Sequence, residues 1–289
     1  MGILLAEQAL NGVQLGLMLF LMAAGLTLVL GIMDMINLAH GSLYMLGAYL
    51  AAAIAQATGS FFAAVALAIV ATAAIGAVLE LSLLRALYRR DHLSQVLATF
   101  ALLLIANEAV RIVWGPQPVP LNPPAWLAGP VQLAPGLAYP AYRLVIIGVG
   151  LAAAALLYVL VTRTRAGMQV RAGASNREMA MAMGGNVPWL FTAVFAIGAA
   201  LCALAGAMLG PLLAVQVGMG ESILILAFVV VVIGGIGSIR GAFVGALLVG
   251  LVDTAGRTLL VPALASISIY VLMAAVLFWK PRGLFPARG

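Results

Sequence analysis

The amino-acid sequence predicts an all-α polytopic integral membrane protein. Hydrophobic residues make up 65% of the 289 residues, charged residues only 8%, and the mean hydropathy is +1.19. A soluble globular domain would carry charge on about a quarter of its residues. The apolar runs are continuous and about 20 residues long, which fits bilayer-crossing helices rather than the alternating ~10-residue strands of a membrane barrel.

The lengths of the apolar runs and the helix-breaking residues between them divide the chain into about eight or nine transmembrane helices. The count can differ by one because glycine-rich parts can be broken or re-entrant. No polar stretch is long enough for a separate soluble domain, so residues 1–289 form a single transmembrane domain. The apolar runs lie at residues 12–30, 43–57, 61–84, 93–114, 144–161, 189–213, 223–236, 242–260 and 267–279.

Arginine placement predicts the orientation in the membrane. The polar segment at residues 163–188 contains Arg163, Arg165, Arg171 and Arg177, and basic loops remain on the cytoplasmic side. Alternation then puts the N-terminus outside, the C-terminus inside, and the proline-rich loop at residues 116–140 outside. The same alternation places most other basic residues inside, namely Arg85, Arg89, Arg90, Arg240, Lys280, Arg282 and Arg288.

The cytoplasmic segment contains the signals of one short surface helix. Ser175 followed by Glu178 fits a capping box. Gly184 and Gly185 can adopt the left-handed conformation that closes a helix, and Pro188 prevents its continuation. The enclosed stretch is far shorter than the ~20 residues that span a bilayer, so we expect this helix to lie at the membrane surface.

One face of this short helix is rich in methionine. Met179 and Met183 are spaced i, i+4, and flexible, polarizable methionine side chains suit a groove on another protein. The alternative is an ordinary positively charged cytoplasmic loop, and the pattern alone leaves both interpretations open.

A second polar interruption separates the first two apolar runs. It contains Asp34, Asn37, His40 and Ser42, with Gly41 among them. Non-helical backbone at membrane depth is tolerated only where it lines a cavity or is buried in protein. Asn37 and His40 can donate and accept hydrogen bonds, so these residues are candidates for a solute path. Capping of helix ends is the alternative.

Other charged residues are expected to neutralise each other near the interfaces. Asp253 and Arg257 at i, i+4 predict an ion pair, and Glu80 lies close to several arginines. Glu108 and Arg111 lie near the outer end of a span, where they can face the proline-rich loop or another protein. Small residues also recur at four-residue spacing, which predicts close helix contacts. They are Gly198, Cys202, Gly206 and Gly210, then Gly237, Gly241 and Gly245.

The sequence gives little support for an enzymatic or a nucleotide-binding function. Lys280 is the sole lysine and Pro281 follows it, so no phosphate-binding P-loop can form. A glycine-rich stretch before Asp253 resembles a dinucleotide fold in outline, but the helix that should follow lacks a polar face. With two histidines and a single cysteine, Cys202, we assign no catalytic residue and no metal site.

Four motifs, in order along nearly the whole chain, resemble the permease subunits of ABC importers for branched-chain amino acids, in particular the shorter of the two paired permeases. Two residues depart from that family's pattern: Gly185, where isoleucine or valine is usual, and the additional acid Asp34. The motifs are Asn37-Leu38-Ala39-His40-Gly41 with Gly47 and Ala48; Arg171-Ala172 with Asn176, Ala180, Gly184 and Asn186; Gly234-Gly235-Ile236-Gly237-Ser238 with Gly241; and Lys280-Pro281-Arg282-Gly283-Leu284-Phe285.

The resemblance implies a multi-pass protein of the bacterial inner membrane without enzymatic activity. It implies a second permease, two cytoplasmic subunits that bind ATP, and a periplasmic solute-binding protein, with no cofactor in this chain and no nucleic acid. The solute would be a branched-chain or other hydrophobic amino acid, or alternatively urea, an amide or an aromatic acid. An ion-coupled secondary transporter is a more distant alternative. The implied ATPase-coupling residues are Arg171, Asn176, Glu178, Met179, Ala180, Met183 and Gly184.

Overall fold

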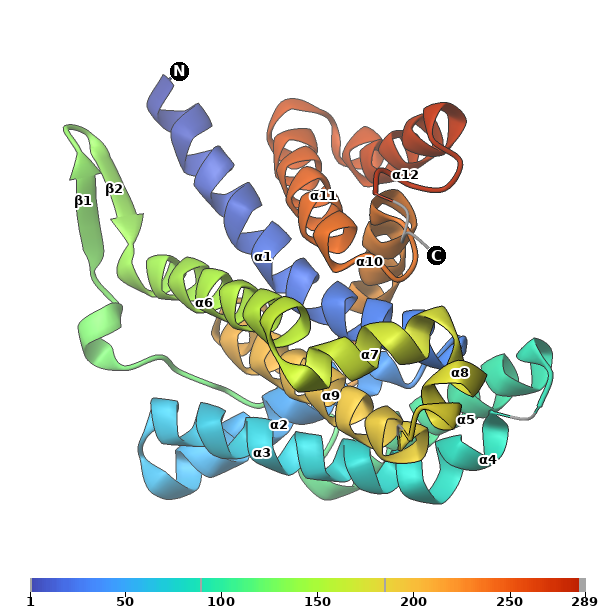
Figure 1. Ribbon diagram of the computed structural model, residues 1–289. Helices are drawn as coiled ribbons and strands as arrows, with labels where there is room; N and C mark the ends of the chain where they lie inside the picture. Colours follow the sequence, from blue (N-terminus) through green and yellow to red (C-terminus); the bar gives the residue numbers. More distant parts are fainter. Residues whose placement is uncertain (1, 89, 185, 286–289) are drawn as a thin grey trace.

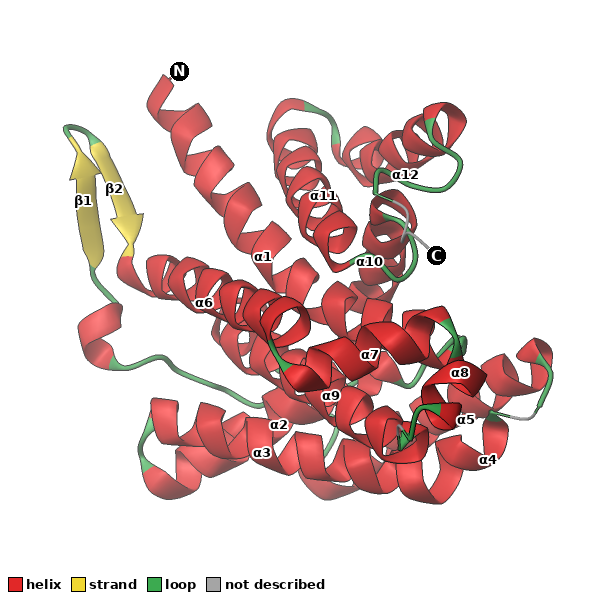
Figure 2. Cartoon of the chain, viewed as in Figure 1, coloured by secondary structure: helices red, strands yellow, loops and turns green. Residues whose placement is uncertain are grey.

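The computed structural model describes residues 2–88, 90–184 and 186–285, and the side chains of residues 177, 178, 262 and 263 are not described. Predictions for Arg89, Gly185 and Arg288 therefore lie outside the described residues. The regular secondary structure of the described chain is helical apart from one hairpin, and loops connect the elements (Figure 2). Its helices are α1 Gly2–Met33, α2 His40–Thr58, α3 Phe61–Leu79, η1 Glu80–Leu84, α4 Arg85–Leu87, α5 His92–Trp114, η2 Ala125–Leu127, α6 Ala141–Arg163, α7 Arg165–Ser175, α8 Arg177–Ala182, α9 Val187–Leu213, α10 Met219–Gly234, α11 Ile239–Leu259 and α12 Pro262–Trp279.

The predicted all-α polytopic fold is confirmed. Among the described residues, six helical stretches are long and apolar enough to cross a membrane, namely α1, the α3–α4 stretch at residues 61–87, α5, α6, α9 and α11. The apolar part of α12 and the whole of α10 are shorter. With α2, which begins at the break after α1, these elements match the nine predicted apolar runs.

Helices α1 and α9 form the centre of the bundle. Within the most apolar 18-residue stretch of each helix, 83% of the residues of α1 and 67% of those of α9 are buried. The corresponding shares are 17% for α5 and 22% for α6. Helix α1 packs on α6, α9, α10 and α11, whereas α9 also packs on α2 and α3. Figure 1 shows α2 and α3 on one side of α1 and α10, α11 and α12 on the other. The outer helices therefore present apolar surface to lipid or to another subunit.

The predicted small-residue contacts occur where central helices cross. Gly25 of α1 meets Gly198 of α9, so a Cβ on Gly25 would lie 3.0 Å from the Gly198 backbone. On the next turns of α9, Cys202 lies beside α2, and Gly206 packs directly on the backbone of Tyr44. Because lipid provides no hydrophobic force between helices, such close packing is a main source of cohesion.

The proline-rich segment at residues 116–140 is extended, as predicted, and holds the single β-hairpin of the described chain. Strand β1 (Pro130–Ala134) pairs antiparallel with β2 (Leu137–Pro140), so that Val131 lies opposite Tyr139. The Tyr139 hydroxyl donates to Asn11 of α1 at 2.9 Å, which fixes the hairpin to the central helix. Figure 1 places the hairpin and α8 at opposite ends of the molecule.

Candidate functional site

The break between α1 and α2 spans residues 34–39. Asp34, which is exposed, adopts a left-handed backbone conformation with φ of +53°. The Asn37 side-chain oxygen accepts a hydrogen bond from the Ala39 amide at 3.0 Å, so Asn37 stabilises the turn that leads into α2. Asn37 and His40 are fully buried, and Ser42 is 7% exposed.

The start of α2 is tightly enclosed by α1, α9 and α10. The His40 ring lies between Gly25 and Gly198, with its Nε2 3.0 Å from the Cys202 sulfur. Gly41 packs on Gly220 of α10, where a Cβ on Gly41 would approach the Gly220 carbonyl oxygen to 2.7 Å. The structure thus brings His40 and Gly41 together in the bundle interior, where glycine is needed for the approach of α10.

Three polar atoms of this segment have no hydrogen-bond partner among the described residues. They are Asn37 Nδ2, His40 Nδ1 and Ser42 Oγ. Leaving a buried polar atom unpaired costs about 1–3 kcal/mol. The segment therefore retains hydrogen-bonding capacity in its interior, beyond what the capping of α2 uses.

The arginine-rich segment folds as two helices, α7 and α8, and not as the single helix predicted. The predicted capping box is wrong in its first residue, because Ser175 is the last residue of α7. Asn176 is the N-cap of α8, and its side-chain oxygen accepts from the Met179 amide at 2.9 Å. An asparagine caps a helix as well as a serine does. The Glu178 side chain lies outside the described part of the chain.

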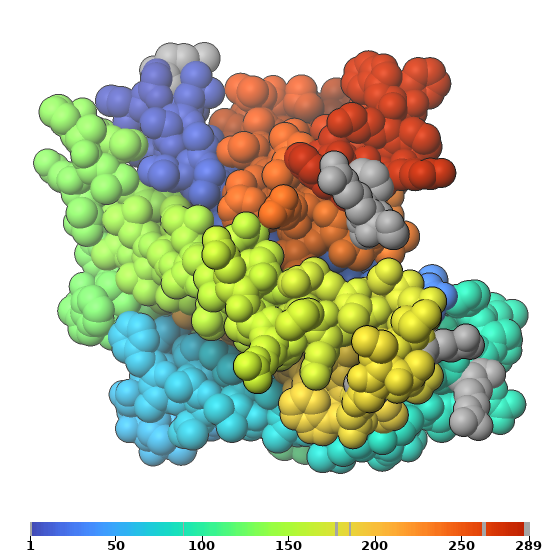
Figure 3. Space-filling view, viewed as in Figure 1, coloured from blue at the N-terminus to red at the C-terminus, as the bar shows by residue number. Residues whose placement is uncertain are grey.

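The remaining predicted coupling residues divide into structural and exposed ones. The Arg171 guanidinium donates to the Val161 carbonyl at the end of α6, and Ala180 packs against the core. Gly184 closes α8 with φ of +84°, as predicted. Met179 and Met183 are 61% and 83% exposed. Figure 3 shows α7 and α8 on the surface, beside the end of the bundle that contains α4.

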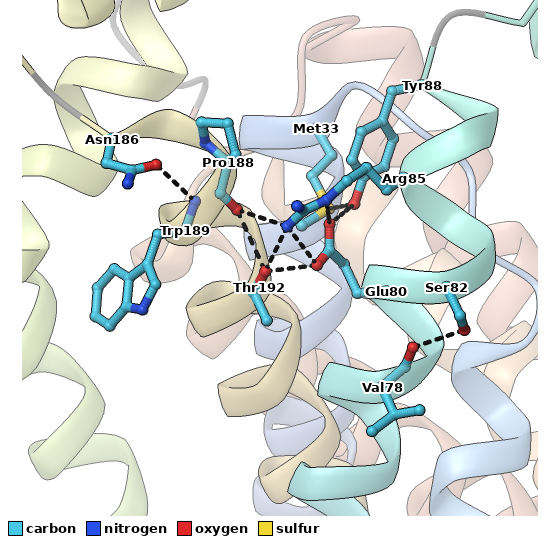
Figure 4. A network of polar contacts seen from close by, with 10 residues as sticks. All are labelled: Met33, Val78, Glu80, Ser82, Arg85, Tyr88, Asn186, Pro188, Trp189 and Thr192. Carbon is cyan, nitrogen blue, oxygen red and sulfur yellow. Dashed lines mark hydrogen bonds and ion pairs between the residues drawn. The ribbon is translucent and has the colours of Figure 1, made fainter.

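A buried carboxyl group links this segment to the bundle. Glu80 is fully buried, and both of its oxygens are bonded. One oxygen accepts from Arg85 at 3.3 Å and from Tyr88 at 2.9 Å, and the other accepts from Arg85 at 3.2 Å and from Thr192 at 2.6 Å. Arg85 also donates to the Pro188 carbonyl at 3.2 Å. Figure 4 shows this network where α9 begins.

The sequence predicted that nearby arginines neutralise Glu80, but it did not predict that the network extends to α9. Thr192 and Pro188 are more than a hundred positions from Arg85, and no local pattern marks them. The network begins in η1, a π-helical turn, a feature that is frequent at functional sites. A cleft of about 820 Å³ opens beside it, with Met181 of α8 and Phe191 of α9 in its lining. The predicted ion pair Asp253–Arg257 forms at 2.8 Å, and Glu108 and Arg111 form a further pair at 3.8 Å.

A bundle of long apolar helices with a central break defines the class of all-α polytopic membrane proteins. The family model described as "Branched-chain amino acid transport system / permease component" matches residues 8–277. The chain therefore belongs to the family of branched-chain amino acid transport system permease components.

Two curated relatives are similar over nearly their full length. The high-affinity branched-chain amino acid transport system permease protein BraD of Pseudomonas aeruginosa is 30% identical over 291 residues, covering 96% of this chain and 94% of BraD. The corresponding protein LivH of Escherichia coli K12 is 30% identical over 297 residues, with coverage of 96% and 94%.

We expect Glu80→Gln to lower the free energy of unfolding by about 1–3 kcal/mol, because it removes a charged acceptor of several hydrogen bonds in a buried place. Arg85 is 40% exposed, so solvent moderates the loss. Thermal unfolding of the purified chain in detergent measures the change. Glu108→Gln is the control, since its side chain is 62% exposed and should contribute at most about 1 kcal/mol. Equal destabilisation by both variants would contradict a structural role for the Glu80 network.

Proposed function

We propose that this chain is the membrane permease subunit of an ABC importer and has no enzymatic activity of its own. Together with a second permease it forms a pathway for branched-chain or other hydrophobic amino acids. Two cytoplasmic subunits that bind ATP drive transport, and a periplasmic binding protein delivers the solute. The family match over residues 8–277 carries this proposal. BraD and LivH, which share 30% identity with the chain, are branched-chain amino acid transport permeases, and this similarity supports the solute class.

The experiment is reconstitution in proteoliposomes with the candidate second permease, ATPases and binding protein. We expect uptake of labelled leucine, valine and isoleucine that requires both ATP and the binding protein. Uptake that follows an imposed ion gradient without ATP would identify a secondary transporter instead. Uptake of urea, an amide or an aromatic acid, with none of branched-chain amino acids, would contradict the proposed solute.

Helix α8 is proposed as the coupling element that docks in an ATPase subunit. Its support is its small size, its position at the end of the molecule opposite the hairpin, and the exposure of Met179 and Met183. Asn176 and Gly184 define the two ends of α8, Ala180 packs it on the core, and Arg171 fixes α7 to the end of α6. Glu178 belongs to the same proposed set. The Glu80 network provides a route for movement, because it joins η1 to the beginning of α9, which follows α8 directly.

We expect Met179→Asp to abolish most solute uptake and ATPase stimulation, since a charge placed in a desolvated contact costs several kcal/mol. Uptake and ATP hydrolysis by the reconstituted importer measure the effect. Met168→Asp on α7 is the control, because Met168 is also exposed, at 57%, but lies outside α8. If Met179→Asp and Met183→Asp both show normal uptake and ATPase stimulation, α8 is not the coupling element.

The proposed orientation rests on the distribution of arginines along the sequence. The N-terminus and residues 116–140 lie outside, residues 163–188 and the C-terminus lie in the cytoplasm, and the protein resides in the bacterial inner membrane. In a Cys202→Ala background, we expect a cysteine at Asn122 to react with an impermeant reagent in intact cells. A cysteine at Ala174 should react only after permeabilisation. Both positions are exposed on the surface of the chain, and labelling of Ala174 from outside would overturn the orientation.

The segment at Asn37, His40, Gly41 and Ser42 is proposed to border the solute path. The unpaired buried atoms of Asn37, His40 and Ser42 support this role. They could bond a polar solute once α1, α2 and α9 separate. In the closely packed arrangement of the structure, the same residues stabilise the start of α2.

A further inference from the structure

Two polar side chains on α5 and α10 meet at an open face of the bundle. Asn107 donates a hydrogen bond from Nδ2 to Glu221 Oε1 at 2.6 Å, and the pair is exposed. The two residues are separated by 114 positions. The second oxygen, Glu221 Oε2, has no protein donor among the described residues, and no described arginine or lysine forms an ion pair with Glu221.

This pair lies beside the start of α2. Gly220, the residue before Glu221, packs on the backbone of Gly41, at the start of α2. The neighbouring His40 packs on Gly198, close to the middle of α9. At 1.5 Å per residue, α2 runs about 25 Å from Gly41 to its other end. The connection between α9 and α10 therefore enters the bundle, and α10 begins well inside it.

An exposed carboxyl group on an apolar helical bundle is unfavourable wherever it faces lipid. Ionisable groups within membrane segments face a water-filled cavity or the bundle interior and mark solute paths. The two buried acids of the described chain, Glu80 and Asp253, are each neutralised by an arginine close in sequence. Glu221 is held instead by a neutral amide, so its charge remains available to a ligand.

We propose that Glu221 and Asn107 line the solute path and that Glu221 binds the ammonium group of the passing amino acid. An ammonium group has three donors and no acceptor. Glu221 Oε2 and Asn107 Oδ1 are free acceptors among the described hydrogen bonds, and bonds between a carboxylate and an ammonium are short and strong. This inference rests on the proposed function and names the chemical group that the path recognises.

The surroundings of the pair suit an aliphatic side chain. Leu104 of α5 and Ile225 of α10 lie one turn from Asn107 and Glu221, on the same helix faces. Both are about half exposed, at 50% and 53%. The face therefore combines acceptors for an ammonium group with an adjoining apolar surface. Leucine, valine and isoleucine carry the matching groups, an ammonium group and an aliphatic side chain.

The test is uptake by the reconstituted importer with Glu221→Gln. We expect leucine uptake to fall about tenfold, the loss expected for one hydrogen bond to a charged group. Assembly with the second permease, leucine affinity of the binding protein and ATPase stimulation by the loaded binding protein should remain unchanged. Glu221→Asp should retain more uptake than Glu221→Gln. Glu108→Gln, beside Asn107 on α5, is the matched control and should transport at the native rate.

The outcomes separate this inference from the function on which it rests. If the Glu221→Gln variant takes up leucine as fast as the native importer, the ammonium assignment is overturned and the proposed function stands. A variant that no longer copurifies with the second permease, or that loses ATPase stimulation together with uptake, would identify Glu221 as a subunit-interface residue and also overturn it. Absence of leucine uptake by the native complex would overturn both the assignment and the proposed function.

Discussion

Close contact between helix backbones is the constraint on which the rest of this structure depends. Glycines of α1 pack on α9 and α11, and glycines of α2, α10 and α11 pack on one another's backbones. In lipid the hydrophobic effect does not drive helices together, so dispersion contacts at short range must do so. Side chains at these positions would separate the helices. Gly41 and Gly220 show the functional consequence, because only their contact allows α10 to begin beside the start of α2.

A rigid bundle of this kind transmits movement through its few polar connections. The first turn of α9 follows α8 and is bonded to η1 and α4 through Glu80, Arg85 and Thr192. Tyr88 extends the connection towards α1, since its hydroxyl lies 3.6 Å from the Met33 sulfur. Met33 is the last residue before the break. A displacement of the proposed coupling helix would therefore act on the beginning of α9, on η1 and α4, and on the end of α1 at the break.

Features that depend on neighbours in sequence were predicted well. Span lengths, the break after α1, the Asp253–Arg257 pair and the glycine spacing on α9 all follow from periodicity and local charge. Local competition between cap residues was harder to resolve. Ser175 and Asn176 are both good N-caps, and the choice of Asn176 depends on α7 continuing through Ser175. Helix α7 itself was missed, because its polar sequence lacks the apolar run by which spans were recognised.

The polar side chains of the bundle show why the candidate site could be predicted only in part. Glu80 and Asp253 take arginines five and four residues away as their ionic partners, so these pairs are visible in the sequence. The Asn107–Glu221 contact joins residues 114 positions apart, and its exposure depends on where α10 enters the bundle. Local pairs neutralise charge and stabilise one helix end. A group that must meet a charged solute cannot be neutralised in this way, and such a group is assembled by tertiary structure from residues that are inconspicuous in sequence.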